Sequence, residues 1–399
     1  MLSLFNKRIN LGLLVNPFYL YCISFSLAIL IYLFGWSKIF PRLSTGLLLF
    51  FMISFILFLI AGKVFIKKNQ DLIKHLSINP NLNDIFFSLI ILLGLIDVLY
   101  MGYLPFMDRS HNYREFGMPV IDVLFNTLSI FFSVWFLQSF MELEKRRFLI
   151  YVGLILAIQF LLFRRSTIVW IIISSLFLLF QYLPKIKIII ILAILLCIPL
   201  LTYSFGLYGN YRSKLSSTFI LNGLGASDSF KKSGVSYNQY IAYLYVSSPL
   251  ANLQENIDKG EGLLNNKDYR NFFFYCVLPE SITMRLEKPL ALKPPSCNLI
   301  TPELIVGTLF MVSYYTLGWI GMITMVIFLF VFIFLILSVI KKWNTFSIST
   351  FSILSTAVSL LIFSNFLNRL DVILMLFIYP IIFHIIYKRS GINFSAEAI

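Results

Sequence analysis

Two adjacent arginines, Arg164 and Arg165, interrupt a long apolar stretch of the chain. Arginine presents a planar fork of N–H donors that matches a phosphate group in a bidentate way. Two guanidinium groups beside apolar segments are costly unless they face water, an anion or a partner. The pair therefore predicts either a site for a phosphate or pyrophosphate, or a hairpin tip whose side chains extend to lipid phosphates.

Further arginines lie in the polar parts of the chain and are candidates for contacts with the same kind of anion. They are Arg109, Arg114, Arg212, Arg270, Arg285 and Arg369. Arg369 has an acidic neighbour, Asp371, and the two side chains could instead form a plain structural ion pair. We expect some of these arginines to bind substrate and others to be solvated loop residues.

Tyrosines recur near these arginines at the spacing of one helix face. Tyr237, Tyr240 and Tyr243 belong to the segment 236–245. A tyrosine ring can pack on the C–H face of a sugar while its hydroxyl makes a hydrogen bond. The spacing predicts a helix that presents these rings to a sugar or, alternatively, lies at the membrane interface as an aromatic belt.

Acidic side chains outside the apolar runs are candidates for a general base that activates a hydroxyl group. These candidates are Asp108, Glu115, Glu255, Glu280, Glu303 and Asp371. Glu303 follows Pro302 at the predicted start of a short apolar helix, where a carboxylate interacts favourably with the helix dipole. Asp97 and Asp122 lie inside apolar runs, and we expect each to face the bundle interior, against a serine, an asparagine or a cation.

Composition indicates that membrane helices must position these residues. Hydrophobic residues make up 59% of the chain and charged residues 13%, far from the averages of globular proteins. The net charge of +14 does not indicate nucleic acid as a partner, because the basic residues form short clusters between apolar runs. The first apolar run, residues 17–35, is too long for a cleavable signal peptide and has no small-residue cleavage site.

The apolar runs predict an all-α polytopic membrane protein with about ten transmembrane helices. The predicted spans are residues 17–36, 43–66, 85–101, 119–140, 148–163, 167–183, 186–204, 318–340, 346–363 and 371–387. Residues 301–316 are also apolar, and we expect a re-entrant or interfacial half-helix there, because a full span would reverse the side of the later basic clusters. Residues 205–300 are predicted to form a large, mainly helical polar loop.

Clusters of lysine and arginine set the expected orientation of the spans. They occur at Lys7 and Arg8, Lys63 to Lys74, Lys145 to Arg147, Lys185 and Lys187, Lys341 and Lys342, and Lys388 and Arg389. All of these clusters fall on one side, which the positive-inside rule makes cytoplasmic. The prediction is therefore spans in residues 1–204, a periplasmic loop in 205–300, the half-helix and three spans in 301–390, and a cytoplasmic tail in 391–399. Both termini are then cytoplasmic.

The cysteines divide by location. Cys22 and Cys197 lie in apolar runs and are expected to be small core residues. Cys276 and Cys297 fall in the polar loop, where they pair in an oxidising compartment or remain thiols. Zinc-binding spacings are absent from the sequence, and we expect neither a metal nor a cofactor.

Several segments together resemble the O-antigen polymerases of the Wzy type, bacterial inner-membrane glycosyltransferases of the GT-C class. The resembling segments are His111–Pro119 before a helix, Tyr237–Leu244 followed by Pro249 and Asn252, and Tyr314–Gly321 where the chain re-enters the membrane. Arg212 and Gly223 have the spacing of an arginine–glycine pair found in periplasmic loops of some members. The plan of about ten helices with one large periplasmic loop is similar as well.

The resemblance implies transfer of a growing glycan from undecaprenyl pyrophosphate to a sugar hydroxyl of an incoming lipid-linked repeat unit. Arg164, Arg165 and Arg212 would stabilise charge on the departing pyrophosphate, and Glu303 is a candidate acid in the same chemistry. The implied substrate-binding set is Arg109, Arg114, Tyr237, Tyr240, Tyr243, Arg270, Arg285 and Arg369. The implied partners are the lipid-linked oligosaccharide, membrane lipid and a chain-length regulator protein.

Related functions fit the sequence less well. O-antigen ligases typically use a histidine in the large periplasmic loop, and residues 205–300 contain none. Many GT-C enzymes carry a metal-linked acid in the first external loop, and residues 37–43 contain no acid. A flippase or exporter of lipid-linked sugars would use the arginines in a charged cavity but does not need a large folded external segment.

Overall fold

The computed structural model describes residues 8–10, 15–68, 78–107, 116–183, 185–187, 203, 206–207, 221–260 and 268–389. Most of these residues are helical, and a ribbon of two three-residue strands, β1 (Arg8–Asn10) and β2 (Lys185–Lys187), pairs antiparallel. Among them, seven helical stretches are long and apolar enough to cross a membrane. The chain is therefore a helical membrane protein, as the apolar runs predict.

The chain divides into two compact units, each with its own core. The first unit draws its described residues from Met1–Val64, Pro184–Val331 and Val358–Arg369. The second unit draws them from Phe65–Leu183, Phe332–Ala357 and Leu370–Ile399.

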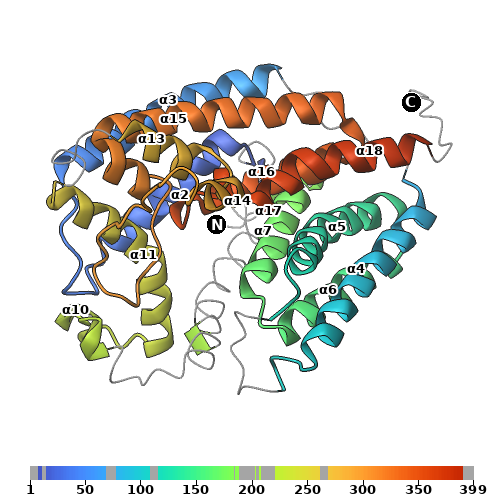
Figure 1. Ribbon diagram of the computed structural model, residues 1–399, viewed down its shortest axis with the longest axis horizontal. Helices are drawn as coiled ribbons and strands as arrows, with labels where there is room; N and C mark the ends of the chain where they lie inside the picture. Colours follow the sequence, from blue (N-terminus) through green and yellow to red (C-terminus); the bar gives the residue numbers. More distant parts are fainter. Residues whose placement is uncertain are drawn as a thin grey trace. The chain divides into compact units, whose positions relative to one another are not determined.

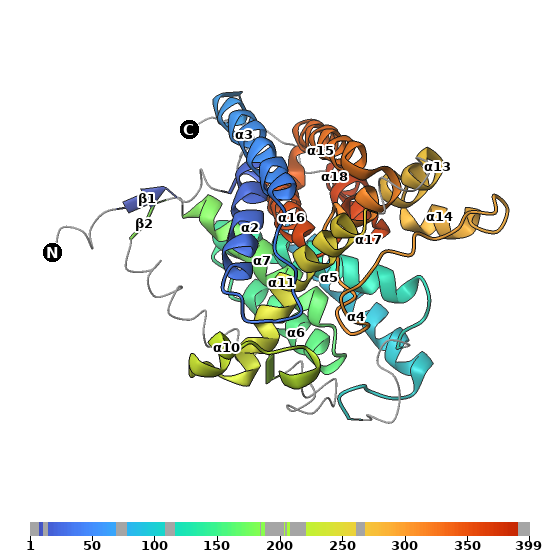
Figure 2. The ribbon, with the colours of Figure 1, turned by 90° about the vertical axis from the view of Figure 1, so that its left-hand side faces the viewer.

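Apolar helices α2 (Pro17–Tyr32), α3 (Thr45–Lys68) and the first part of α15 (Met311–Lys342) form one side of the first unit. Asn16 and Pro17 start α2: the Asn16 side chain accepts a hydrogen bond from a free N–H of the first turn, and proline fits the first helical position. The helix α3 lies beside α15 (Figures 1 and 2), where the rings of Phe58 and Phe330 stack with centroids 4.4 Å apart.

The polar segment of the first unit is mainly helical in its described part. It comprises α10 (Asp228–Lys232), α11 (Tyr237–Asp258), α13 (Tyr269–Phe272), the π-helix η3 (Phe273–Val277) and α14 (Glu280–Leu286). Ser236 and Gln239 form a capping box that fixes the start of α11. This helix packs against α2 (Figures 1 and 2), so the polar segment is attached to the apolar part of its unit.

The second unit is built around α5 (Ile121–Leu143), which contacts α4 (Pro80–Met101), α6 (Arg147–Leu161) and α7 (Arg165–Tyr182) (Figure 1). Most of α5 is buried, whereas only a minority of α4 is buried. The C-terminal elements of this unit are η4 (Asn344–Phe346), α16 (Ser347–Ser359), α17 (Leu370–Ile373), the π-helix η7 (Leu374–Ile378) and α18 (Tyr379–Arg389). The 3-10 helix η5 (Leu360–Ile362) follows α16 and belongs to the first unit.

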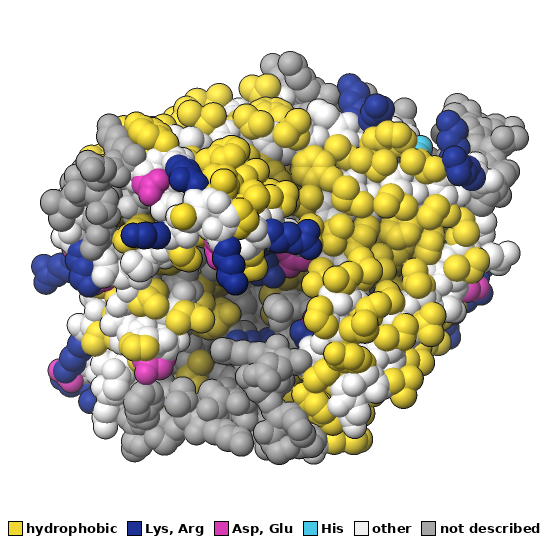
Figure 3. Space-filling model, in the orientation of Figure 1, with side chains coloured by type: hydrophobic (Ala, Val, Ile, Leu, Met, Phe, Trp, Pro, Cys, Tyr) yellow, Lys and Arg dark blue, Asp and Glu magenta, His cyan; other side chains and the backbone are white. Residues whose placement is uncertain are grey.

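Apolar side chains remain exposed on the outer helices, and Figure 3 shows how widely they cover one face. On α3 they include Leu49, Met52, Ile53, Ile56 and Ile60, and on α4 they include Ile85, Leu92, Leu95 and Leu99. Apolar patches of this extent are unusual on soluble proteins but suit a surface that faces lipid.

Nine of the predicted spans coincide with helices, although two of these helices are short. Of these two, α2 has 16 residues and α6 has 15. The predicted span 186–204 is wrong at its start, because Lys185–Lys187 pairs as a strand with Arg8–Asn10; most of its remainder lies outside the described residues.

The segment 301–316 differs from the prediction, because its helix begins at Met311 rather than at Pro302. The buried amide of Asn252 on α11 donates to Leu304 O (2.6 Å) and Val306 O (2.8 Å), and it accepts from Ile300 N (3.0 Å). These backbone groups are therefore held by a side chain instead of by helical hydrogen bonds. Glu303 consequently lies in an exposed turn, outside any helix dipole.

A break at Gly318 divides α15 into two helical pieces. Gly318 has φ 61° and ψ −144°, a conformation that only glycine adopts readily. A Cβ on Gly321 would lie 2.0 Å from the Ser313 carbonyl oxygen, so glycine is needed there as well. The piece Met311–Leu317 is thus a short helix that covers only the last part of the predicted segment, and its re-entrant or interfacial position remains a prediction.

Candidate functional site

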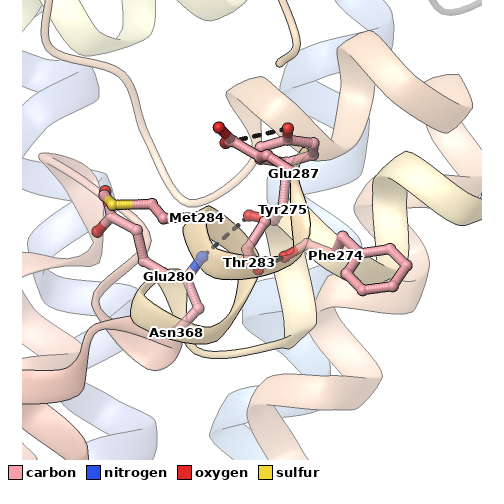
Figure 4. Close-up of a pocket in the computed structure, with 7 residues that line it drawn as sticks. All are labelled: Phe274, Tyr275, Glu280, Thr283, Met284, Glu287 and Asn368. Carbon is pink, nitrogen blue, oxygen red and sulfur yellow. Dashed lines mark hydrogen bonds between the residues drawn. The ribbon is translucent and has the colours of Figure 1, made fainter. Parts of the chain in front are cut away.

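A polar pocket lies in the first unit, where α14 meets η3 and the 3-10 helix η6 (Phe366–Asn368). Its lining residues are Phe274, Tyr275, Glu280, Thr283, Met284, Glu287 and Asn368 (Figure 4). Its cavity volume is about 90 Å³, below the range of about 300–1,000 Å³ for small-molecule sites. The pocket therefore admits a small chemical group rather than a whole ligand.

One face of α14 supplies most of the polar lining. Glu280, Thr283, Met284 and Glu287 follow the spacing i, i+3, i+4 and i+7, which places their side chains along one side of a helix. That spacing was visible in the sequence and locates the two glutamates together. Asn368 comes from a distant part of the chain, so no sequence pattern connects it with α14.

The donors in the pocket already have partners within the protein. Tyr275 donates its hydroxyl to Glu287 Oε1 (3.2 Å), and Asn368 donates its amide to the Tyr275 carbonyl (2.9 Å) (Figure 4). Thr283 donates to the Phe274 carbonyl. Partial burial and the nearby Glu287 carboxylate raise the pKa of Tyr275, so its phenol keeps donating at neutral pH. The remaining carboxylate oxygens can accept hydrogen bonds from a ligand that carries hydroxyl or ammonium groups.

Three predicted substrate-binding arginines lie in the same part of the first unit. Arg285 is exposed on α14, next to the lining residue Met284. Arg369 follows the lining residue Asn368, and its guanidinium lies 5.2 Å from the centre of the Phe366 ring. Arg270 on α13 donates to the Leu290 carbonyl, which gives it a structural role.

The tyrosines of α11 form part of a buried core rather than an open face. Tyr240 is 0% exposed and Tyr243 is 3% exposed, in a cluster with Leu224 and Phe230. Tyr240 donates to the Leu224 carbonyl (2.9 Å), and the Tyr243 hydroxyl accepts from Trp36 N (3.1 Å). Burial raises the pKa of Tyr240 to about 12. The helix itself was predicted, but the rings of Tyr240 and Tyr243 are covered in this structure, and packing is their visible role.

Tyr237 lies at the edge of this cluster and is only half-buried. Its hydroxyl oxygen is buried and makes no hydrogen bond. Partial burial raises its pKa. Of the three tyrosines, Tyr237 is therefore the least buried, but its hydroxyl is not open to a ligand in this structure.

In the second unit, Arg164 is paired with an acidic side chain at the corner between α6 and α7. Its guanidinium donates to Asp122 Oδ1 and to the Phe116 carbonyl, each at 2.5 Å. The two side chains are only 18% and 20% exposed. Arg164 is therefore largely buried within the protein, and a carboxylate of the protein occupies the place expected for an anion.

Asp97 on α4 is completely buried beside this ion pair. Its Oδ1 accepts from Met118 N (2.9 Å), whereas its Oδ2 is buried and makes no hydrogen bond with the part of the chain that the structure describes. Asn126 donates to Asp122 Oδ1 (3.1 Å). We call Asp97, Asp122, Asn126 and Arg164 the charged cluster. The expectation that Asp97 and Asp122 face the bundle interior is met. Asp122 has a cation and an asparagine as hydrogen-bond partners, whereas Asp97 bonds to a backbone N–H instead of the expected side chain.

The chain turn before α5 packs directly on the charged cluster. Gly117 has φ 109°, and a Cβ at this position would lie 2.8 Å from the side chain of Asp122. Glycine is therefore required for residues 116–118 to approach closely enough to bond with Arg164 and Asp97.

The other predicted site residues divide between described and undescribed parts of the chain. Arg165 begins α7 in the second unit and is partly buried. Arg109, Arg114 and Arg212 lie outside the described residues. The roles predicted for these four arginines remain predictions.

The described residues contain no group of three or more His, Cys, Asp or Glu side chains that could hold a metal ion. Cys276 and Cys297 are thiols in this structure. Burial raises the pKa of the Cys276 thiol, which makes it a poor nucleophile.

Comparison of the chain with models of protein families, with curated proteins and with solved structures found no match. The geometry therefore carries the functional argument. It defines a helical membrane protein that has a polar pocket in one unit and a buried charged cluster in the other.

Proposed function

We propose that this chain is a membrane glycosyltransferase that joins lipid-linked oligosaccharide repeat units into a surface polysaccharide such as O-antigen. The observation that carries the proposal is the pocket of α14, η3 and η6, which offers carboxylate oxygens to a ligand rich in hydroxyl groups. The same unit contains the apolar helices α2, α3 and the start of α15, which provide a surface for a polyprenyl chain. A pocket with carboxylate groups in the same unit as apolar helices suits a substrate that has both a glycan and a lipid.

In the proposed reaction, a hydroxyl oxygen of the acceptor sugar attacks the anomeric carbon of the donor glycan. The bond from that carbon to the pyrophosphate oxygen breaks, and the electron pair leaves with undecaprenyl pyrophosphate. Glu280 or Glu287 accepts the hydroxyl proton as general base. Glu280 is the exposed member of the pair, and Glu287 is fixed by the hydroxyl of Tyr275.

Arginines near the pocket are assigned to the pyrophosphate. Arg285 and Arg369 are chain neighbours of lining residues, and a guanidinium stabilises the charge that develops on a departing pyrophosphate. Arg165 and Arg212 remain further candidates for binding the pyrophosphate. Arg164 is neutralised by Asp122, so its first role is structural.

The proposed location is the inner membrane of a bacterium, with both termini cytoplasmic and the polar segment periplasmic. The basic residues at the ends of α15 and α18, among them Lys342 and Arg389, support this orientation through the positive-inside rule. A chain-length regulator is the proposed protein partner.

The test combines a deletion strain with the purified protein. Loss of this chain should give lipopolysaccharide with one repeat unit and no ladder, and purified protein should form oligomers from lipid-linked repeat units. Either Glu280→Gln or Glu287→Gln, whichever removes the general base, should lower the rate of oligomer formation about a hundredfold or more, the low end for loss of a general base. Asp228→Asn is the control, because Asp228 is an exposed acid paired with Lys38. An intact ladder in the deletion strain, with no oligomers from the purified protein, would refute the proposal.

Transport of the lipid-linked oligosaccharide is the second candidate function. The charged cluster favours it, because ionisable side chains inside membrane-spanning helices often mark a translocation path. A transporter deletion would leave repeat units on the cytoplasmic face, whereas a polymerase deletion would leave single units exported. The side on which the units accumulate separates the two functions.

A further inference from the structure

The charged cluster of the second unit has an unbalanced formal charge in apolar surroundings. Asp97 and Asp122 are two carboxylates, and Arg164 is the cation that acts on both of them. Asp122 comes from α5, Asp97 from α4 and Arg164 from the corner between α6 and α7. Arg165 is the next residue and begins α7. With both acids ionised, these three side chains would carry one excess negative charge.

The hydrogen bonds show that Arg164 is paired with Asp122 rather than with Asp97. Asp122 Oδ1 receives the guanidinium of Arg164 at 2.5 Å and the amide of Asn126 at 3.1 Å. Asp97 receives one backbone N–H, and its Oδ2 is fully buried and receives no donor from the described residues. An ionised carboxylate would leave much of its charge on that oxygen, which is expensive away from water.

A proton fits this oxygen better than a metal ion does. Hard cations such as Ca²⁺ or Mg²⁺ need about six or more oxygen ligands. The described residues hold no group of three or more candidate ligands, and the Phe116 carbonyl is already bonded to Arg164. A proton needs only one oxygen.

We propose that the charged cluster is a proton-binding site within the membrane-spanning helices, and that the proton resides on Asp97 Oδ2. With the proton in place, Asp97 is neutral, and Arg164 bonds only to Asp122 and to the Phe116 carbonyl among these groups. Loss of the proton would make Asp97 compete with Asp122 for Arg164. The bond from Arg164 to the Phe116 carbonyl would then weaken, so proton binding stabilises this contact.

The test is infrared spectroscopy of the purified full-length protein in lipid nanodiscs at neutral pH. The wild type should show the C=O stretch of a protonated carboxylic acid. The band should lie at the high-frequency end of the range for such acids, where an acid without a hydrogen-bond acceptor absorbs. Asp97→Asn should remove this band. Asp122→Asn should remove it too, because Arg164 then pairs with Asp97 and one carboxylate balances one guanidinium. Asp84→Asn is the matched control and should keep the band, since Asp84 is paired with Arg147 at 2.9 Å.

Folding of the Asp97→Asn variant provides a second, independent measurement. Asparagine resembles a protonated aspartic acid in shape and charge, so this variant should keep the unfolding temperature of the wild type. Absence of the acid band from the wild type would overturn the proposal. Persistence of the band in Asp97→Asn, or failure of this variant to fold, would do the same. Neither measurement depends on glycosyl transfer.

Discussion

At the scale of single residues, buried asparagines of α11 hold the turn that leads into α15. Asn256 exchanges two hydrogen bonds with the backbone of Asn298, at 2.9 and 3.0 Å. Asn252 holds Ile300, Leu304 and Val306 in the same way. Both side chains are 0% exposed. Because buried backbone groups need partners, these two amides replace the secondary structure that residues 298–306 lack.

Asn252→Ala should therefore destabilise the protein strongly. It leaves two carbonyl groups and one N–H without partners, which should cost about 2–4 kcal/mol. The measurement is thermal unfolding of the purified protein in detergent. Asn271→Ala is the control, because its exposed amide donates to the Lys293 carbonyl and water can replace it. Equal unfolding temperatures for the two variants would contradict the role of Asn252.

A second residue-scale prediction concerns the pH dependence that Tyr240 contributes. Its pKa is 10.0 in a model compound and about 12 in the folded protein. The folded state thus holds the phenolic proton more tightly, and the associated stability is complete below pH 10 and lost as the pH rises towards 12. The unfolding temperature of the wild type should fall more steeply across this window than that of Tyr240→Phe. Parallel curves for the two proteins would count against the buried position of Tyr240.

At the scale of elements, hydropathy predicted most helices but not their interruptions. The runs of apolar residues located α3, α4, α5 and α7, because transfer into lipid depends on local composition. The break at Gly318 depends on one backbone conformation, and the turn at 301–310 depends on a side chain of α11.

The candidate sites were also predictable only in part, because they depend on contacts between residues that are distant in the sequence. The apolar runs on both sides of Arg164 predicted a recessed position for it. Its partner Asp122 lies on another helix, and hydropathy carries no information about pairing between distant residues. The face of α14 with Glu280 and Glu287 follows from helical spacing. Its closure into a pocket depends on Asn368, which only the fold brings to the Tyr275 carbonyl.

Replacement of Gly318 tests the break in α15. Gly318→Ala forces a Cβ into a backbone conformation that costs about 1–3 kcal/mol for residues other than glycine, so the unfolding temperature should fall. Gly153→Ala is the matched control: it lies within α6, and a Cβ there meets nothing within 4 Å. Alanine also favours a helix over glycine, so the control should be neutral or slightly stabilising. A tolerated Gly318→Ala would show that the two pieces of α15 can join into one straight helix.

At the scale of the whole molecule, the lengths of the pieces of α15 decide how often the chain crosses the membrane after the polar segment. The helix has 32 residues, and the piece before Gly318, Met311–Leu317, is only about 10 Å long. A bilayer core of about 30 Å is too thick for it. The piece after Gly318 is about 36 Å long and suffices for one crossing. Residues 301–317 should therefore not add a crossing of their own.

The lengths of the two pieces of α15 predict that Ser227 and Lys342 lie on opposite sides of the membrane. Reporter fusions at Ser227 should read periplasmic, and fusions after Lys342 should read cytoplasmic, together with fusions after Arg147, whose basic cluster has the same expected side. Because each reporter is active on only one side, the pair at Ser227 and Lys342 gives opposite signals if there is one crossing. The same signal at both positions would mean that Met311–Leu317 or the irregular turn before it also traverses the bilayer. That turn contains backbone groups bonded to Asn252 of α11, which lipid could not replace.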